Sequence, residues 1–238
     1  MVRSNKTAVV AHRGASGFAP ENTLAAFSKA INMGADYVEL DVQFTLDEKV
    51  VVIHDPTLER TTNFVGNVSD FTLTELQKAD AGSWFSEDFS NEKVPTLEQV
   101  LDLVSGRLQL NVEIKNREEY STIVDKVIHI LKKNLFHDVF ISSFSRDIIE
   151  LVKEIDQSIQ TGYLFEHKLL KHIYEGNWEF LCASHLLVNR EFFNKAREYG
   201  KRLFVWTVNK NHEMEKMIEL GVDGIITNYP DILKKMLD

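Results

Sequence analysis

Residues 37–55 read YVELDVQFTLDEKVVVIHD, and this stretch decides the fold. It holds two runs rich in β-branched and apolar residues, 37–44 and 50–55, which are typical of strands. Five residues separate them, whereas a connection between parallel strands needs about a dozen or more. The two strands are therefore expected to form an antiparallel hairpin. With its loop centred between Asp47 and Glu48, Asp41 is expected to face His54.

Seven further runs of Val, Ile and Leu predict strands at 8–14, 108–115, 139–144, 160–166, 184–189, 203–209 and 223–229. Helix-length segments lie between most strands, at 21–33, 96–105, 118–133, 145–155, 167–175, 190–199, 211–220 and 230–238. This alternation indicates parallel pairing. With the return strand of the hairpin set aside, eight parallel strands and eight helices remain. The pattern predicts a (β/α)8 TIM barrel, in a single domain over residues 1–238.

Residues 56–95 interrupt this regular pattern. The segment between the hairpin and its helix is far longer than the two to about six residues that usually connect a barrel strand to its helix. Aromatic residues within it predict a small packed insertion: Phe64, Phe71, Trp84, Phe85 and Phe89. Because it follows a strand, we expect it over the C-terminal face of the barrel, where it would shape the pocket for part of a substrate.

Composition excludes several classes of protein. The chain carries 27 Lys and Arg against 36 Asp and Glu, a net charge of -9, which argues against nucleic-acid binding and stable membrane association. Its apolar runs are far shorter than the ~20 residues of a membrane span, so we expect a cytoplasmic protein. The single Cys182 has no partner for an internal disulfide and is expected to be a buried small hydrophobe. The oligomeric state is left open.

Acidic side chains fall on one face of two predicted strands. A period of two places Glu39 and Asp41 on the lumen side of strand 37–44, and Glu113 and Lys115 on the lumen side of strand 108–115. Isolated buried carboxylates are costly, and an all-oxygen set suits Ca2+ or Mg2+ better than zinc. The pattern predicts one divalent cation, Ca2+ or Mg2+, on the three carboxylates. The alternative is that they point outward or pair with Lys115 and Arg13.

Two histidines are expected beside these carboxylates. His12 ends the first strand, next in order to the strand that carries Glu39 and Asp41, and the hairpin brings His54 to the same place. The ordinary histidine pKa, about 6.5, suits proton transfer at neutral pH. The two histidines are therefore candidates for a general acid and base.

Several motifs together resemble the glycerophosphodiester phosphodiesterase family. They occur in the family's order and approximate spacing from residue 8 to about 232, and they are His12-Arg13-Gly14-Ala15-Ser16-Gly17, Pro20-Glu21-Asn22-Thr23, Glu39-Leu40-Asp41-Val42, His54-Asp55, Thr61-Thr62, Pro95-Thr96-Leu97-Glu98, Glu113-Ile114-Lys115, Trp206-Thr207-Val208-Asn209 and Asp223-Gly224. The family also carries an insertion after its His-Asp motif. Among the departures from its pattern are Glu48, where a hairpin Gly is usual, and Asn228, where an Asp is common.

The resemblance implies roles for individual residues. His12 and His54 would be the acid and base, in an order left open, and Arg13 and Lys115 would bind phosphate. The three carboxylates described above would bind the divalent cation. Trp206 is either part of the lumen core or a wall for the glycerol or alcohol group.

The activity implied is metal-dependent hydrolysis of a small-molecule glycerophosphodiester to sn-glycerol 3-phosphate and an alcohol. Either water or the substrate's own 2-hydroxyl could attack phosphorus, and the preferred alcohol is left open. One alternative is a lysophospholipase D-like enzyme that acts on lipid-tailed phosphodiesters. Another is a non-catalytic protein of the same fold that binds phosphodiesters.

Overall fold

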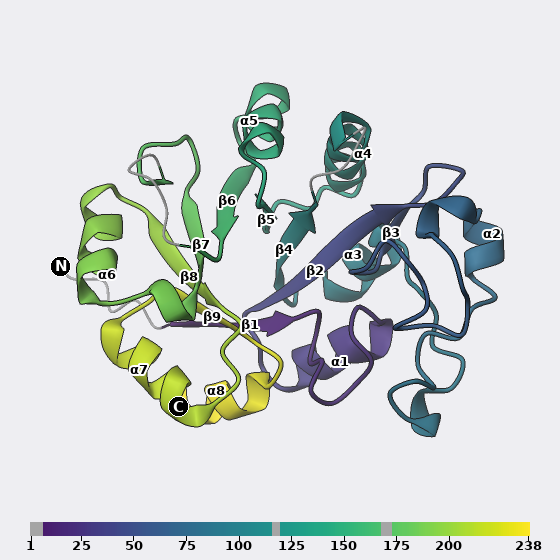
Figure 1. The fold of residues 1–238 in the computed structure, drawn as a ribbon, viewed down its shortest axis with the longest axis horizontal. Coiled ribbons are helices and arrows are strands. Elements are labelled where there is room, and N and C mark those ends of the chain that lie inside the picture. The colour runs from purple at the N-terminus through teal and green to yellow at the C-terminus, as the bar shows by residue number, and fades with distance from the viewer. Residues whose placement is uncertain (1–6, 116–119, 168–172) are drawn as a thin grey trace.

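The computed structural model describes residues 7–115, 120–167 and 173–238. Eight parallel strands close into a barrel, because β1 pairs with both β2 and β9, as Figure 1 shows. β3 pairs antiparallel with β2 outside this ring. The strands are β1 (Ala8–His12), β2 (Tyr37–Phe44), β3 (Val50–Val52), β4 (Gln109–Ile114), β5 (Val139–Ser143), β6 (Gln160–Phe165), β7 (Phe180–Ser184), β8 (Arg202–Trp206) and β9 (Gly224–Thr227). The predicted barrel is confirmed.

The helices surround the barrel (Figure 1). They are α1 (Leu24–Asn32), α2 (Leu73–Leu76), α3 (Leu97–Val104), α4 (Tyr120–Lys133), α5 (Arg146–Ile155), α6 (Arg190–Glu198), α7 (Asn211–Leu220) and α8 (Pro230–Leu237). The helix predicted at 167–175 falls largely on residues 168–172, which lie outside the described part of the chain. None of the described helices is long and apolar enough to cross a membrane.

One strand lies earlier than predicted. β7 spans Phe180–Ser184, and the predicted strand 184–189 begins with a short 3-10 helix, His185–Leu187. Residues 180–183 are buried, with Phe180 and Cys182 in the lumen, whereas the Leu186 side chain is 81% exposed. Leu186 is thus a surface residue of the loop after the strand, whereas Leu187 is half-buried against the core. Cys182 is buried, as predicted.

The barrel wall separates two apolar regions. Val38, Leu40 and Val42 pack outward against the helices, as the period of two predicts. The lower lumen is filled by a second cluster: Val10, Phe140, Leu164, Phe180, Cys182, Phe204 and Ile226. Within it the rings of Phe140 and Phe180 stack with centroids 4.1 Å apart. The polar lumen positions therefore lie above an apolar floor.

The hairpin forms, but its register differs from the prediction by one residue. Val42 pairs with Val52 and Phe44 with Val50, and the Ile53 N–H donates to the Asp41 carbonyl at 3.0 Å. Asp41 therefore lies opposite Ile53 and not His54. Glu48, in the loop, adopts a left-handed conformation, φ 54°. This is the position at which the family usually has glycine.

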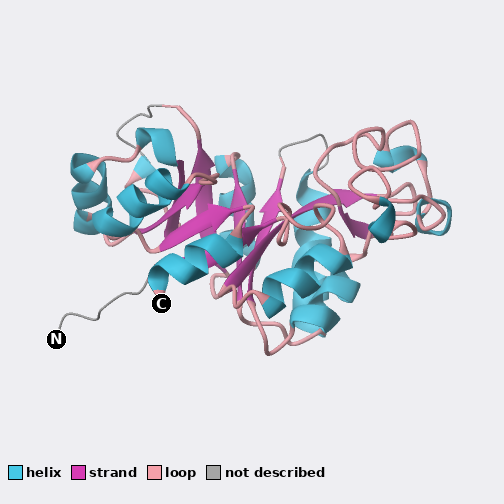
Figure 2. Ribbon diagram, turned by 90° about the horizontal axis from the view of Figure 1, so that it is seen from below, coloured by secondary structure: helices cyan, strands magenta, loops and turns pink. Residues whose placement is uncertain are grey.

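The insertion, residues 56–95, is packed as predicted. Short helices at Val68–Asp70, α2 and Glu87–Phe89 surround an apolar cluster that continues from β3. Trp84 and Phe85, by contrast, lie at the surface, 42% and 37% exposed. Figures 1 and 2 place the insertion at one side of the barrel, beyond the end of β2, and the Leu46 N–H in the hairpin loop donates to the Phe71 carbonyl at 2.8 Å.

Gly14, in the loop after β1, provides a test of this architecture. Its φ is 81°, and a Cβ added there would lie 2.7 Å from the Ala26 backbone carbon in α1. Gly106 has a similar φ, 68°, with no atom within 4 Å of such a Cβ. Gly106→Ala should cost about 1 kcal/mol for the left-handed backbone. Gly14→Ala should cost about 1–3 kcal/mol more, because the loop must also move away from α1.

Urea denaturation of both variants measures this difference in the free energy of unfolding. Equal losses in the two variants would show that the loop does not depend on close contact with α1.

Candidate active site

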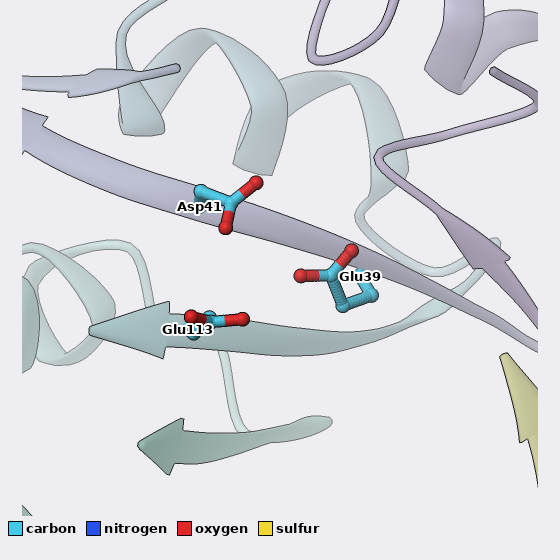
Figure 3. A group of neighbouring side chains, drawn as sticks. All are labelled: Glu39, Asp41 and Glu113. Carbon is cyan, nitrogen blue, oxygen red and sulfur yellow. The ribbon is translucent and has the colours of Figure 1, made fainter. Parts of the chain in front are cut away.

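Three carboxylates meet at the C-terminal mouth of the barrel. Glu39 and Asp41 extend from β2, and Glu113 extends from β4 at the position paired with Asp41. Each offers an oxygen within 4.8 Å of the others, and Figure 3 shows the three groups turned toward one another. The structure therefore brings together the three residues predicted to hold a divalent cation.

Burial and mutual repulsion dominate the electrostatics of this carboxylate cluster. Burial raises the pKa of Glu39 well above its ordinary value, and the charges of Asp41 and Glu113 raise it further. Burial and the charge of Asp41 likewise raise the pKa of Glu113. Burial acts in the same direction on Asp41, but the charges of Lys115 and Arg13 outweigh it and lower that pKa below its ordinary value. A buried site that resists negative charge is one that a divalent cation fits.

Lys115 and Arg13 balance part of this charge. Lys115 Nζ lies 2.6 Å from Glu113 Oε1 and 3.0 Å from Asp41 Oδ1, and Arg13 Nε lies 3.3 Å from Asp41 Oδ2. The pairing that the alternative interpretation expected is thus present. Glu39 differs, since its described hydrogen bond is to the Arg13 backbone N–H, at 3.0 Å. Both cationic side chains also line the cavity, where they can reach an anionic ligand.

Arg13 has a left-handed backbone, φ 55°. This conformation is unfavourable for a residue with a Cβ. It directs the Arg13 N–H at Glu39 and the guanidinium at Asp41, so local strain is combined with two favourable contacts.

The two histidines are each held through Nδ1. His12 donates from Nδ1 to the Asn228 side-chain oxygen at 2.7 Å, and His54 donates from Nδ1 to Asp55 at 2.6 Å. Burial and the charge of Arg13 lower the pKa of His12 to about 4. Burial lowers the pKa of His54 as well, and Asp41 opposes that shift. With Nδ1 committed, each ring has Nε2 available for proton transfer.

A cavity of about 200 Å3 joins these groups. Seven of the eight predicted site residues line it, and Asp41 is the exception. The full lining is His12, Arg13, Glu39, His54, Asn111, Glu113, Lys115, Phe144, Leu164, Glu166, Trp206, Thr207 and Ile226. None of the described residues lining it comes from the insertion, so the influence of the insertion on this pocket stays a prediction. A larger cavity, about 460 Å3, lies at the opposite end around Tyr37 and Phe140, away from the carboxylates.

Contacts from outside the predicted set hold the site residues in place. Asn22, with φ 58°, donates from Nδ2 to Asp41 at 3.0 Å. Glu21 accepts from Arg13 at 2.8 Å and also from both terminal nitrogens of Arg60 at 2.8 Å. Arg60 belongs to the insertion, and its Nε donates to Asp55, the partner of His54. A single arginine thus links the carboxylates that hold Arg13 and His54.

Part of this arrangement had a signal in the sequence. Extending the period of two by one step beyond β5, β6 and β9 places Phe144, Glu166 and Asn228 on the lumen side. No comparable signal identifies Arg60, which lies 39 residues from Glu21, or the left-handed backbone of Asn22.

Arg60→Ala should lower kcat/KM for a phosphodiester substrate about ten-fold, or ~1.4 kcal/mol. The reason is that Glu21 and Asp55 lose the partner that they share. Arg197→Ala is a matched control, because Arg197 pairs with Asp223 at 2.9 Å near the opposite end of the barrel. Steady-state kinetics should separate the two variants. The same kcat/KM in both would mean that the Arg60 contacts do not affect the site.

Comparison with known proteins identifies the family. Residues 12–232 match the glycerophosphoryl diester phosphodiesterase family. A glycerophosphodiester phosphodiesterase of Caldanaerobacter subterraneus is 42% identical, over 96% of each chain. A phosphodiesterase of Oleispira antarctica, solved with the product sn-glycerol-3-phosphate, superposes with a TM-score of 0.92 at 28% identity, covering 97% of this chain and 96% of its own. This chain belongs to the glycerophosphoryl diester phosphodiesterase family and is a phosphoric diester hydrolase.

Proposed function

We propose that this enzyme hydrolyses glycerophosphodiesters to sn-glycerol 3-phosphate and an alcohol, with one divalent cation, Ca2+ or Mg2+. The observation that carries the proposal is the carboxylate cluster of Glu39, Asp41 and Glu113 in a cavity that His12 and His54 also line. The product bound to the Oleispira antarctica relative supports the same reaction.

The three carboxylates, Arg13 and Lys115 would together bind the cation and the phosphate. The three carboxylates would hold the cation, which when bound neutralises phosphate oxygens and stabilises charge at phosphorus. Arg13 offers a forked guanidinium and Lys115 a compact ammonium to the same phosphate. The hydrogen bond from Asn22 orients the Asp41 carboxylate.

The surroundings of the two histidines favour different roles. Burial and the charge of Arg13 lower the pKa of His12 to about 4, so its ring is neutral at pH 7. Nε2, which lies 3.9 Å from Glu39 Oε2, then carries the lone pair that accepts a proton from the attacking oxygen. Asp55 is a carboxylate and stabilises a positive ring at His54, which suits proton donation to the leaving alcohol. We therefore assign the base to His12 and the acid to His54. Either water or the substrate's 2-hydroxyl can supply the attacking oxygen.

The two alternatives receive less support. The cavity of about 200 Å3 matches a short headgroup in size and is too small to enclose an acyl chain. A non-catalytic binding protein would have no need for two oriented histidines, and both are held here by side-chain hydrogen bonds.

Chelation should abolish release of glycerol 3-phosphate from glycerophosphocholine, because the carboxylate cluster then has no cation to share. Excess EDTA followed by dialysis, with a coupled assay for glycerol 3-phosphate, measures this. Added Ca2+ or Mg2+ should restore turnover. Full activity of the dialysed enzyme in EDTA would contradict a role for the cation.

His12→Ala and His54→Ala should each lower kcat on glycerophosphocholine by about 10²–10⁴-fold, the usual range for loss of acid or base catalysis. A p-nitrophenyl ester of glycerol 3-phosphate separates the roles, because its leaving group departs without a proton. On this ester His54→Ala should recover most of its activity and His12→Ala should not. The reverse pattern would exchange the two roles, and near-normal kcat in either variant would remove that residue from the mechanism.

A further inference from the structure

Opposite walls of the active cavity differ in chemical character. In the order of strands around the barrel, β6 lies four strands from β1 in either direction, directly across the mouth. His12 and Arg13 stand at the end of β1, and Glu166 follows β6. All three line the cavity. Arg13 and Glu166 therefore lie on opposite sides of the cavity.

Two aromatic rings form part of this wall. Phe144 follows β5 and Trp206 ends β8, and their ring planes meet at 86° with centroids 5.6 Å apart. Trp206 Nε1 donates to the Cys182 carbonyl at 2.8 Å, which fixes the orientation of the indole. The Phe144 side is open, since this residue is 44% exposed. The rings make a right-angled aromatic corner at the cavity mouth.

Glu166 adds a negative charge to this corner. Its side chain is 57% exposed, and its ion pair is with His167, at 3.5 Å. Glu166 also lines the cavity, so a positively charged ligand bound there can reach its carboxylate.

We propose that Phe144, Trp206 and Glu166 form the subsite for the alcohol and select alcohols that carry a positive charge, such as choline and ethanolamine. This inference rests on the proposed function. Cations are attracted to aromatic faces by about 0.5–2 kcal/mol, and the carboxylate adds a Coulomb attraction. A neutral alcohol such as glycerol gains neither, and an acyl chain would bring apolar groups against Glu166.

The preference is measured as kcat/KM on sn-glycerophosphocholine and on glycerophosphoglycerol, whose alcohol is uncharged. Both contain the glycerol 3-phosphate half, so their ratio compares the two alcohols. The wild-type enzyme should favour the choline ester about ten-fold. Glu166→Gln should lower the choline-to-glycerol ratio about five-fold, and Phe144→Leu should lower it as well. Phe144→Tyr, which keeps the aromatic face, should retain it.

Glu191→Gln, an exposed change on α6, is the matched control and should leave the ratio unchanged. Calorimetric binding of phosphocholine to wild type and Glu166→Gln gives a readout that needs no turnover, and the variant should bind more weakly. Equal ratios and equal phosphocholine binding in these two proteins would overturn the subsite. A wild-type preference for the glycerol ester, or for a lysophospholipid, would also overturn it. Absence of turnover on every ester would instead contradict the proposed function.

Discussion

The burial of three carboxylates in the mouth of one barrel is the constraint on which the rest of this structure depends. Glu39, Asp41 and Glu113 stand above a lumen filled with aromatic and aliphatic side chains, so solvent offers them little screening. Their charge must be balanced locally, by Arg13 and Lys115 and by a bound cation. Arg13 and Lys115 also line the cavity, where the proposed function assigns them to phosphate. Stability and the proposed chemistry therefore depend on the same residues.

The balance extends outward as a chain of ion pairs. Arg13 is held by Glu21, Glu21 by Arg60, Arg60 by Asp55, and Asp55 by His54. This series of ion pairs begins at Arg13, a proposed phosphate ligand, and ends at His54, a proposed catalytic histidine. Its central arginine comes from the insertion, so a segment that contributes no described residue to the cavity lining is nonetheless joined to the site. Arg60 thus places the insertion in contact with Glu21 and Asp55, the partners of Arg13 and His54.

Periodicity in the sequence predicted the barrel and most of the carboxylate cluster. Alternating residues on two strands were enough to place Glu39 and Glu113 in the lumen, and a short loop was enough to identify the hairpin. The hairpin register was wrong by one because the prediction centred the loop between Asp47 and Glu48, whereas the pairing of Phe44 with Val50 centres it on Asp47. Arg60 could not be predicted because its partners are distant in sequence and meet only when the insertion packs. Such tertiary contacts produce no periodic pattern in the sequence.

Titration calorimetry with Ca2+ and Mg2+ tests the central claim most directly, namely that the carboxylate cluster exists to hold a cation. The metal-free wild-type enzyme should bind one divalent ion per chain. Glu39→Gln, Asp41→Asn and Glu113→Gln should each weaken that binding, because each removes a charged ligand. Glu191→Gln should bind as the wild type does. Binding of unchanged affinity in all three variants, or no binding to the wild type, would contradict the account.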